Sequence, residues 1–306
     1  MNRRTFGLAC AGAALFATGA AATAQPRPAG PPGYPSKPVK LIVAAAAGSS
    51  PDSIVTGTER MVRAPADGYT FAVTTIAAAA VGPSLIEKMP YDPAKDMEPV
   101  TLLMSLPNLL VVHPSVPVTN LRELIAYAKA NPTKLRYGHP GAGTTPHLSG
   151  ELLKQQAGIQ MQGIPYRSSA QMTTDLLGGH YEVLFHNSSV LLPHAKGGAA
   201  RVLGITSAER VPTLPDIPTI AEAGGLKGFS VNAWWGLHAP AGTPADIVAK
   251  VHADVAAALA QPDVKAWIDG QGGVGGGDTP QALRAFQAAE AQKWRDLIRA
   301  ANIKAD

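Results

Sequence analysis

Apolar residues along the chain form short runs that alternate with amphipathic stretches. The first run, residues 39–44, is short and almost wholly apolar, as is typical of a buried strand. Residues 53–63 can form a short helix, and residues 69–74 have the pattern of a second strand after the turn at 66–68. This order predicts a strand–helix–strand unit at the start of the globular part of the chain.

Two apolar runs further along are long enough to connect separate parts of a protein. The first, residues 99–113, is interrupted by Pro107, and the second spans residues 229–238. Between them the pattern alternates between helical and extended periodicity, which predicts an α/β unit with a largely parallel sheet. We expect helices at 120–130, 145–157, 168–177 and 189–196, and strands at 135–138, 159–166, 182–185 and 201–206.

Since the chain crosses twice, we expect an α/β fold of two lobes with a central cleft, in which the first lobe is built from both ends of the chain. Lobe 1 then comprises residues 37–104 plus 231–306, and lobe 2 comprises residues 105–230. The cleft is the expected ligand site, and Trp234 and Trp235 either line it or pack in the core. After the second crossing we expect three helices, at 244–259, 262–268 and 280–301.

The N-terminal segment has the pattern of an export signal. Arg3 and Arg4 precede an apolar run, and Ala22-Thr23-Ala24 provides a small-residue cleavage site. We expect residues 1–24 to be a signal peptide cleaved near Ala24, residues 25–36 to be a Pro/Gly-rich linker, and the mature protein to be periplasmic. The arginine pair partly matches a twin-arginine signal, so Tat and Sec export both stay open, and an N-terminal membrane anchor is the alternative.

Composition and charge fit an ordinary globular protein, with 46% hydrophobic and 16% charged residues. The formal net charge of +4 becomes +2 in the mature chain, because the leader carries Arg3 and Arg4 and no acid. We expect no nucleic-acid partner, since lysines and arginines do not cluster and aromatics are not interleaved with them. The single cysteine, Cys10, lies in the leader, so the mature chain has no disulfide and no cysteine nucleophile.

The segment 138–147, Gly-His-Pro-Gly-Ala-Gly-Thr-Thr-Pro-His, is the strongest candidate for ligand binding. It follows a predicted strand and begins a predicted helix. Small residues let backbone N–H groups approach a ligand, and a helix N-terminus offers unpaired donors and a favourable dipole for an anion. The alternative is an ordinary helix start with a Gly-rich turn.

Other chemical motifs are weak. Residues 270–275 fit G-x-G-x-x-G formally, but no strand precedes them, so we expect a flexible surface loop and no cofactor. His139 and His147 are eight residues apart, as are His186 and His194, and neither pair has the spacing of metal ligands. No G-x-S-x-G motif occurs either, so we expect no metal, no catalytic residue and no enzyme activity.

Short motifs match a known family in order along the mature chain. They lie at 34–39 (Tyr-Pro-Ser-Lys-Pro-Val), 67–70 (Asp-Gly-Tyr-Thr), 90–96 (Pro-Tyr-Asp-Pro-Ala-Lys-Asp), 143–148 (Gly-Thr-Thr-Pro-His-Leu), 175–179 (Asp-Leu-Leu-Gly-Gly), 214–219 (Leu-Pro-Asp-Ile-Pro-Thr) and 239–244 (Ala-Pro-Ala-Gly-Thr-Pro). With them the chain resembles the extracytoplasmic solute receptors of the Bug type, the binding components of tripartite tricarboxylate transporters.

This resemblance implies a type II periplasmic binding-protein fold that closes on a carboxylate, which backbone N–H groups and ordered water hold. It also implies a small carboxylate ligand, such as a di- or tricarboxylate, and a membrane transporter subunit or a sensor as partner. We expect the receptor to be a monomer. The ligand-binding residues that the resemblance implies are Ala47, Gly48, Ser49, Asp52, Thr74, Thr75, Gly143, Thr144, Thr145, His147, Tyr166 and Asn187.

The chain departs from the family pattern in three places. Its first loop is rich in alanine where the family has Pro, Phe and several Gly. His186 stands where the family often has an Asp that can serve an amino group, which argues for a plain carboxylate ligand. Only fourteen residues separate Asp52 from Asp67, so we expect lobe 1 to lack one helix and one strand of the family, with an apolar face and a sheet edge exposed.

Three functional hypotheses follow. The first is a carboxylate receptor for a transporter or a sensor. The second is a receptor remnant whose binding is impaired by the internal gap, and the third is an exported enzyme that uses the same cleft.

Overall fold

The computed structural model describes residues 30–43 and 51–304. The leader with Cys10 and the candidates Ala47, Gly48 and Ser49 lie outside these residues. The helices are α1 (Pro51–Val62), α2 (Gly82–Leu85), α3 (Pro93–Asp96), α4 (Leu121–Ala130), α5 (Thr145–Ala157), α6 (Ser169–Leu177), α7 (Ser188–Lys196), α8 (Ile220–Gly224), α9 (Ala245–Leu259), α10 (Pro262–Gly270) and α11 (Pro280–Ala300), with a π-helical turn η1 (Ala77–Val81). The strands are β1 (Lys40–Val43), β2 (Thr70–Thr75), β3 (Met97–Val112), β4 (Arg136–His139), β5 (Gln162–Pro165), β6 (Val183–Asn187), β7 (Arg201–Ile205), β8 (Asn232–Pro240) and β9 (Val274–Gly275).

The strands form two sheets that share β3. In the first sheet, β1 is parallel to β2, β8 lies antiparallel between β2 and β3, and the short β9 pairs with β3. In the second sheet, β4 is parallel to β5 and β6, while β6 and β7 pair antiparallel with β3. Strands β4 to β7 therefore run in one direction, as the alternating pattern predicts, and β3 is their antiparallel neighbour.

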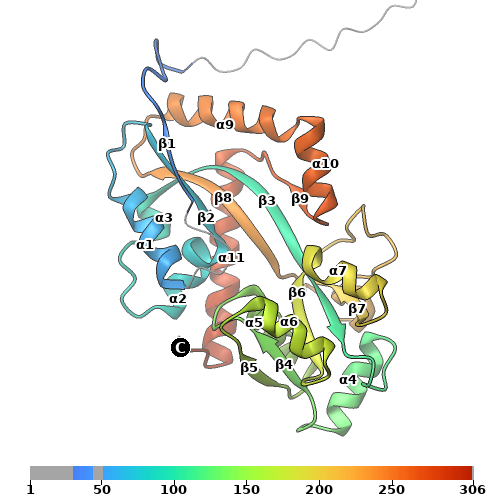
Figure 1. The fold of residues 1–306 in the computed structure, drawn as a ribbon. Helices are drawn as coiled ribbons and strands as arrows, with labels where there is room; N and C mark the ends of the chain where they lie inside the picture. The colour runs from blue at the N-terminus through green and yellow to red at the C-terminus, as the bar shows by residue number, and fades with distance from the viewer. Residues whose placement is uncertain (1–29, 44–50, 305–306) are drawn as a thin grey trace, which may run out of the picture.

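The first long apolar run is one strand, β3, which passes from the first sheet to the second (Figure 1). Its part up to Pro107 pairs with β8, and its part from Asn108 pairs with β6 and β7. The change of partner falls at Pro107, whose nitrogen has no hydrogen to donate to a ladder. The second crossing lies just before β8, where the N–H of Val231 donates to the carbonyl oxygen of Thr206 at 2.9 Å. The chain thus crosses twice between two α/β lobes, as predicted, while the lobe boundaries given above stay predictions.

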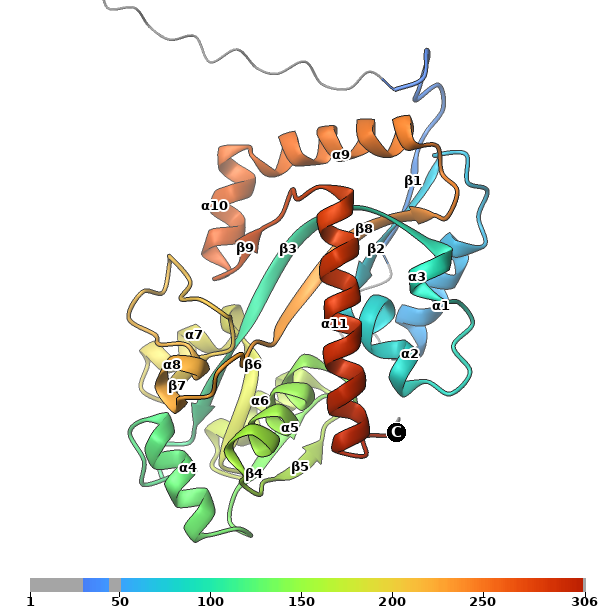
Figure 2. The same cartoon turned by 180° about the vertical axis from the view of Figure 1, so that it is seen from behind.

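Helices cover both faces of the first sheet (Figures 1 and 2). Phe71 and Ala72 are successive residues of β2 and therefore point to opposite faces. Phe71 is buried with Ile247 of α9 on one face. On the other face, Ala72 is buried in the same cluster as Met61 of α1 and Trp294 of α11. The lobe 1 sheet is therefore sandwiched between α9 and the pair α1 and α11.

β1 lies at the outer edge of the first sheet, with β2 as its only partner strand among the described residues. Its residues Leu41 and Val43 and the preceding Val39 are 54%, 60% and 41% exposed, whereas Ile42 packs against the core. One face of β1 is therefore apolar and open to solvent. This agrees with the edge and the apolar face expected from the short connection before β2; the loss of a helix and a strand remains our inference.

The Gly-rich stretch 270–277 is ordered against β3, which corrects the expectation of a flexible surface loop. Val274 and Gly275 form β9 and pair with Met104 and Ser105. A Cβ on Gly276 would lie only 2.0 Å from the carbonyl oxygen of Leu102. Glycine is needed here because the backbone of this segment lies directly on the strand, an approach that the sequence pattern alone did not indicate.

Candidate functional site

The segment 138–147 connects the end of β4 to the start of α5, as predicted. Gly141 and Gly143 have φ angles of 126° and 74°, which side chains rarely tolerate, so both positions favour glycine. Thr144 occupies the N-cap of α5, but its Oγ1 donates to the carbonyl oxygen of Gly141 at 2.7 Å and does not cap the helix. Among the described residues, the side chain of the N-cap residue therefore does not cap α5, whose helix dipole favours an anion at this end.

Two imidazoles fix the shape of this loop. Nδ1 of His139 accepts the N–H of Gly141 at 3.3 Å, and Nδ1 of His147 accepts the N–H of Gly143 at 3.2 Å. Their ring centroids are 4.4 Å apart, and the ring of Tyr137 lies beside both. The N–H groups of Gly141 and Gly143 are thus bonded within the loop, as is that of Thr144, which donates to the carbonyl oxygen of Gly141 at 3.4 Å. The contacts place His147 in the loop as a structural support, and its contact with ligand stays a prediction.

The loop between β4 and α5 makes an apolar contact with η1 and α2, the two turns between β2 and α3. A Cβ on Gly143 would lie 2.5 Å from Cδ2 of Leu85 and 3.1 Å from Cγ1 of Val81. Val81 ends η1 and Leu85 ends α2, so these two turns lie against the loop that leads into α5. Asp52 lies in the first turn of α1, and its side chain is outside the described part of the chain.

The end of β2 places its two threonines in different surroundings. Thr74 is fully buried, and its Oγ1 lies 2.8 Å from Nδ1 of His238 and donates to the carbonyl oxygen of Gly236 at 3.3 Å. These contacts within the first sheet argue against direct ligand contact by Thr74. Thr75 is also buried, but its hydroxyl has no hydrogen-bond partner among the described residues. Of the two, Thr75 is therefore the one with capacity for a further hydrogen bond.

Asn187 lies next to a residue that the sequence analysis missed. It is the register partner of Asn108 across β6 and β3. Asn108 is fully buried, and its Nδ2 donates to Oγ of Ser149 at 3.3 Å, while Ser149 donates to the carbonyl oxygen of Thr145 at 2.7 Å. Its Oδ1 has no partner among the described residues. Asn108, Asn187 and the first turn of α5 therefore belong together, and the only sequence signal for Asn108 was a polar residue inside a long apolar run.

His186 precedes Asn187 in β6, and Tyr166 directly follows β5. Nδ1 of His186 accepts the N–H of Asn187 at 2.7 Å, and burial lowers the pKa of His186 to about 4, so the imidazole is uncharged at neutral pH. Tyr166 follows β5, and its ring packs against that of Tyr181 at a centroid distance of 5.7 Å. Burial and then the neighbouring Asp175 raise the pKa of Tyr166 to about 12. Its ligand contact stays a prediction.

The two tryptophans of the second crossing have different roles. Trp234 is fully buried, and its indole N–H donates to Oε2 of Glu290 at 3.3 Å, so it belongs to the core. Trp235 instead lines an apolar groove of about 320 Å³ on the lobe 1 sheet. The other residues that line this groove are Val73, Leu103, Met104, Leu106, Trp267 and Gln271.

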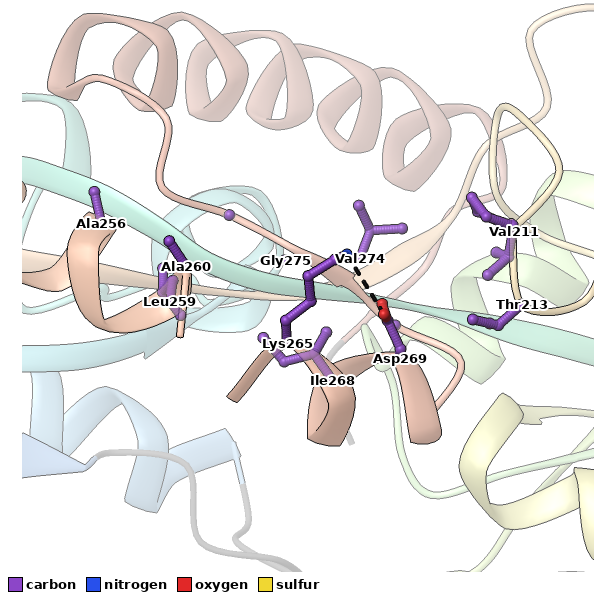
Figure 3. A pocket seen from close by; sticks show the side chains of 13 residues that line it. Val211, Thr213, Ala256, Leu259, Ala260, Lys265, Ile268, Asp269, Val274 and Gly275 are labelled. Carbon is purple, nitrogen blue, oxygen red and sulfur yellow. Dashed lines mark ion pairs between the residues drawn. The ribbon is translucent and has the colours of Figure 1, made fainter. Parts of the chain in front are cut away.

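A slightly larger pocket, of about 340 Å³, is drawn in Figure 3. It is bordered by residues 211–213 and by parts of α9, α10 and β9, and its only ion pair in the described chain joins Lys265 to Asp269 at 3.4 Å. None of the predicted ligand-binding residues lines it, and that pair is exposed. We therefore place the site at the start of α5, beside the buried Asn108, whose Oδ1 has no partner among the described residues.

In the described part of the chain, residues 30–43 and 51–304, no group of three or more His, Cys, Asp or Glu side chains is arranged to hold a metal ion. None of its helices combines the length and the apolarity that a membrane span requires.

Known proteins resemble this chain over most of its length. The family model of the tripartite tricarboxylate transporter family receptor matches residues 39–303. Protein BugT of Bordetella pertussis is 30% identical, over 89% of this chain and 91% of its own length. The UPF0065 protein in the tcbD-tcbE intergenic region of Pseudomonas sp. (strain P51) is 33% identical, over 80% of this chain and 72% of its own length.

Solved structures also resemble this chain over most of its length. R. palustris Rpa4515 with adipate is 33% identical and aligns with a TM-score of 0.75, over 89% of this chain and 99% of its own. MatC from Rhodopseudomonas palustris with bound malate is 28% identical and aligns with a TM-score of 0.69, over 87% of this chain and 100% of its own. These neighbours confirm the periplasmic binding-protein fold expected from the resemblance. The chain belongs to the tripartite tricarboxylate transporter family of receptors.

Proposed function

We propose that the protein captures a small carboxylate outside the cytoplasmic membrane and delivers it to a tripartite tricarboxylate-type transporter. The observation that carries the proposal is the start of α5, where the side chain of the N-cap residue Thr144 bonds to Gly141 and no described N-cap side chain caps the helix. A helix N-terminus favours an anion by its dipole and its free N–H groups. Relatives with the same fold hold adipate and malate, which are both small dicarboxylates.

The proposed ligand lies between the start of α5 and the elements that follow β1 and β2. Thr145 and Asn187 contribute from lobe 2, and Thr75 contributes its unpaired hydroxyl from lobe 1. Ala47, Gly48, Ser49 and Asp52 complete the site in our proposal on the strength of the resemblance alone.

The ligand in this proposal is a plain carboxylate without an ammonium group. Position 186 carries a histidine whose buried imidazole is neutral, so it brings no negative charge to pair with an amine. A ligand hydroxyl, by contrast, suits the unpartnered carbonyl oxygen of Asn108, which needs a donor.

We base the proposed location and partner on the family. We place the protein in the periplasm, reached through a signal peptide of the Tat or Sec type. All proposed site residues come from one chain, so a single copy suffices to bind ligand. A membrane subunit of the transporter is the proposed acceptor, and no chemical conversion of the ligand is involved.

A binding-impaired remnant is the second candidate. The observation that favours it is the exposed apolar face of Val39, Leu41 and Val43, which is unusual for the sheet of a finished receptor domain. A lobe that exposes such a face can fold and still lack part of the ligand cleft.

Thermal unfolding of the purified exported protein with a panel of di- and tricarboxylates separates these candidates. A ligand present at about 100 times its Kd stabilises the folded state by about 2.7 kcal/mol, which raises the Tm measurably. Asn187→Ala should abolish the shift, whereas Asn131→Ala, a control at the C-terminus of α4, should keep it. A cooperative melt that no carboxylate raises would favour the remnant, and turnover of a panel member would favour the enzyme.

A further inference from the structure

We propose that β1 pairs antiparallel with β1 of a second copy of this chain, so that the protein forms a two-fold dimer through its first sheet. This inference is independent of ligand capture, and it replaces the monomer expected from the sequence. Val39, Leu41 and Val43 are three of the six large apolar side chains that are exposed in the described part of the chain. All three lie in one short stretch at the outer edge of the first sheet, where no other strand of the described residues pairs.

The free backbone groups at this edge belong to the same three residues. The N–H of Lys40 donates to the carbonyl oxygen of Tyr69 at 2.8 Å, so Lys40 directs its backbone groups toward β2. Successive residues of a strand direct their N–H and C=O groups to opposite edges, so Val39, Leu41 and Val43 direct theirs outward. The edge therefore offers a row of donors and acceptors to an incoming strand.

One register satisfies both the backbone and the side chains. With the two-fold axis at Leu41, this residue stands opposite its own copy, and Val39 stands opposite Val43 of the second copy. All three outward residues then form hydrogen-bonded pairs, and apolar side chains face apolar side chains. Lys40 falls opposite Ile42 of the second copy, whereas an axis at Lys40 would set two lysines against each other. The charge of Lys40 thus favours the register with the axis at Leu41. Because both copies use the same surface in this contact, the assembly stops at a dimer.

The apolar surface continues inward from the edge. Val43 is the register partner of Val73, which lines the groove beside Trp235 and Trp267. A short strand pair buries much less than the roughly 800 Å² per partner of a stable interface, so we expect weak association in the micromolar range. The dimer should therefore depend on protein concentration.

A cross-linking experiment tests the register directly. The exported chain has no cysteine once the leader is removed, so Leu41→Cys introduces a single thiol. Hydrogen-bonded antiparallel partners have Cα atoms about 5.5 Å apart, which is within the disulfide range of about 4.4–6.8 Å. Under mild oxidation Leu41→Cys should form a covalent dimer. Lys40→Cys on the same strand and Val274→Cys, an exposed apolar position on β9, should remain monomeric.

Sedimentation velocity of the unmodified protein provides the second readout. We expect a concentration-dependent dimer, and Leu41→Lys should raise its dissociation constant at least about tenfold, since two lysines then face each other. An unchanged melting curve of Leu41→Lys would show that the variant folds. A protein that is monomeric at all concentrations would overturn the proposal, and so would Lys40→Cys if it formed cross-links as fast as Leu41→Cys. The proposal would also be wrong if the backbone amides of β1 became protected from exchange only when transporter subunits are added.

Discussion

A buried histidine should make the stability of this protein fall in mild acid. His238 lies in β8 with no exposed surface, inside a network that joins four elements, β2, η1, β8 and α11. Its Nε2 lies 3.0 Å from Oε1 of Gln287, whose amide nitrogen donates to the carbonyl oxygen of Ala79 at 3.1 Å. The oxygen of Gln287 accepts, so Nε2 carries the proton, and Nδ1 lies 2.8 Å from Oγ1 of Thr74. Mild acid adds a proton to Nδ1 of His238, and the variant His238→Gln lacks this titrating group.

The magnitude follows from the pKa. Burial lowers the pKa of His238 from 6.5 to about 4, although its bond to Gln287 acts in the opposite direction. Because the folded-state pKa lies below the unfolded value, the full stability is present above about pH 6.5 and is lost as the pH falls toward 4. The free energy of unfolding should decrease by about 2 kcal/mol at about pH 5, and by about 3 kcal/mol below pH 4.

Urea unfolding followed by tryptophan fluorescence measures this effect. Between about pH 7.5 and pH 5 the natural protein should lose about 2 kcal/mol more stability than His238→Gln does. His186→Gln should remove a second loss of similar size, because burial lowers the pKa of His186 to about 4 as well. If the natural protein and His238→Gln lose stability in parallel across this range, His238 is not a buried neutral imidazole and the reasoning is wrong.

Three further changes have expected outcomes. Trp234→Phe removes a buried indole donor from Glu290 and should lower the free energy of unfolding by about 1–3 kcal/mol in urea titrations, whereas Trp235→Phe in the groove should cost less than 1 kcal/mol. Gly143→Ala adds a Cβ at a φ of 74° and 2.5 Å from the side chain of Leu85, so it should lower the free energy of unfolding by about 1–3 kcal/mol. Calorimetry should also show weaker carboxylate binding, and an unchanged affinity would mean that this loop is not part of the site. Glu182→Gln breaks the partly exposed ion pair with Arg136 of β4, and because solvent screens such a pair, the free energy of unfolding should fall by less than about 1 kcal/mol in urea titrations. A larger loss would show that solvent does not screen this pair.

The elements of the fold could be predicted because their signals are local. Helix α5 begins and ends where the pattern at 145–157 predicts, and β3 occupies the long apolar run around Pro107. Periodicity, proline and glycine act within a few residues along the chain, so they are visible without the fold. The exposed edge at β1 could also be anticipated, because the fourteen residues between Asp52 and Asp67 hold only one crossover.

The candidate site was less predictable, since it depends on contacts between distant residues. Asn108 meets Asn187 through the register of β3 and β6, and no local pattern sets that register. Thr74 matched a family position, but its hydroxyl is bonded to His238 from the far end of the chain. The stretch 270–277 was misjudged for the same reason, because its close approach to β3 is a tertiary contact.

The position of β8 in the first sheet has a consequence for biogenesis. β8 lies between β2 and β3, so Ala72 pairs with His238 and Met97 pairs with Pro240. A nascent chain can assemble β3 to β7 from neighbouring segments, but it cannot complete the first sheet until β8 has been synthesised. During that interval β2 has only β1 beside it, and a two-stranded pair is marginal in water. The N-terminal half therefore depends on the last third of the chain, and cells must keep an incompletely made chain from aggregating through its unpaired strands.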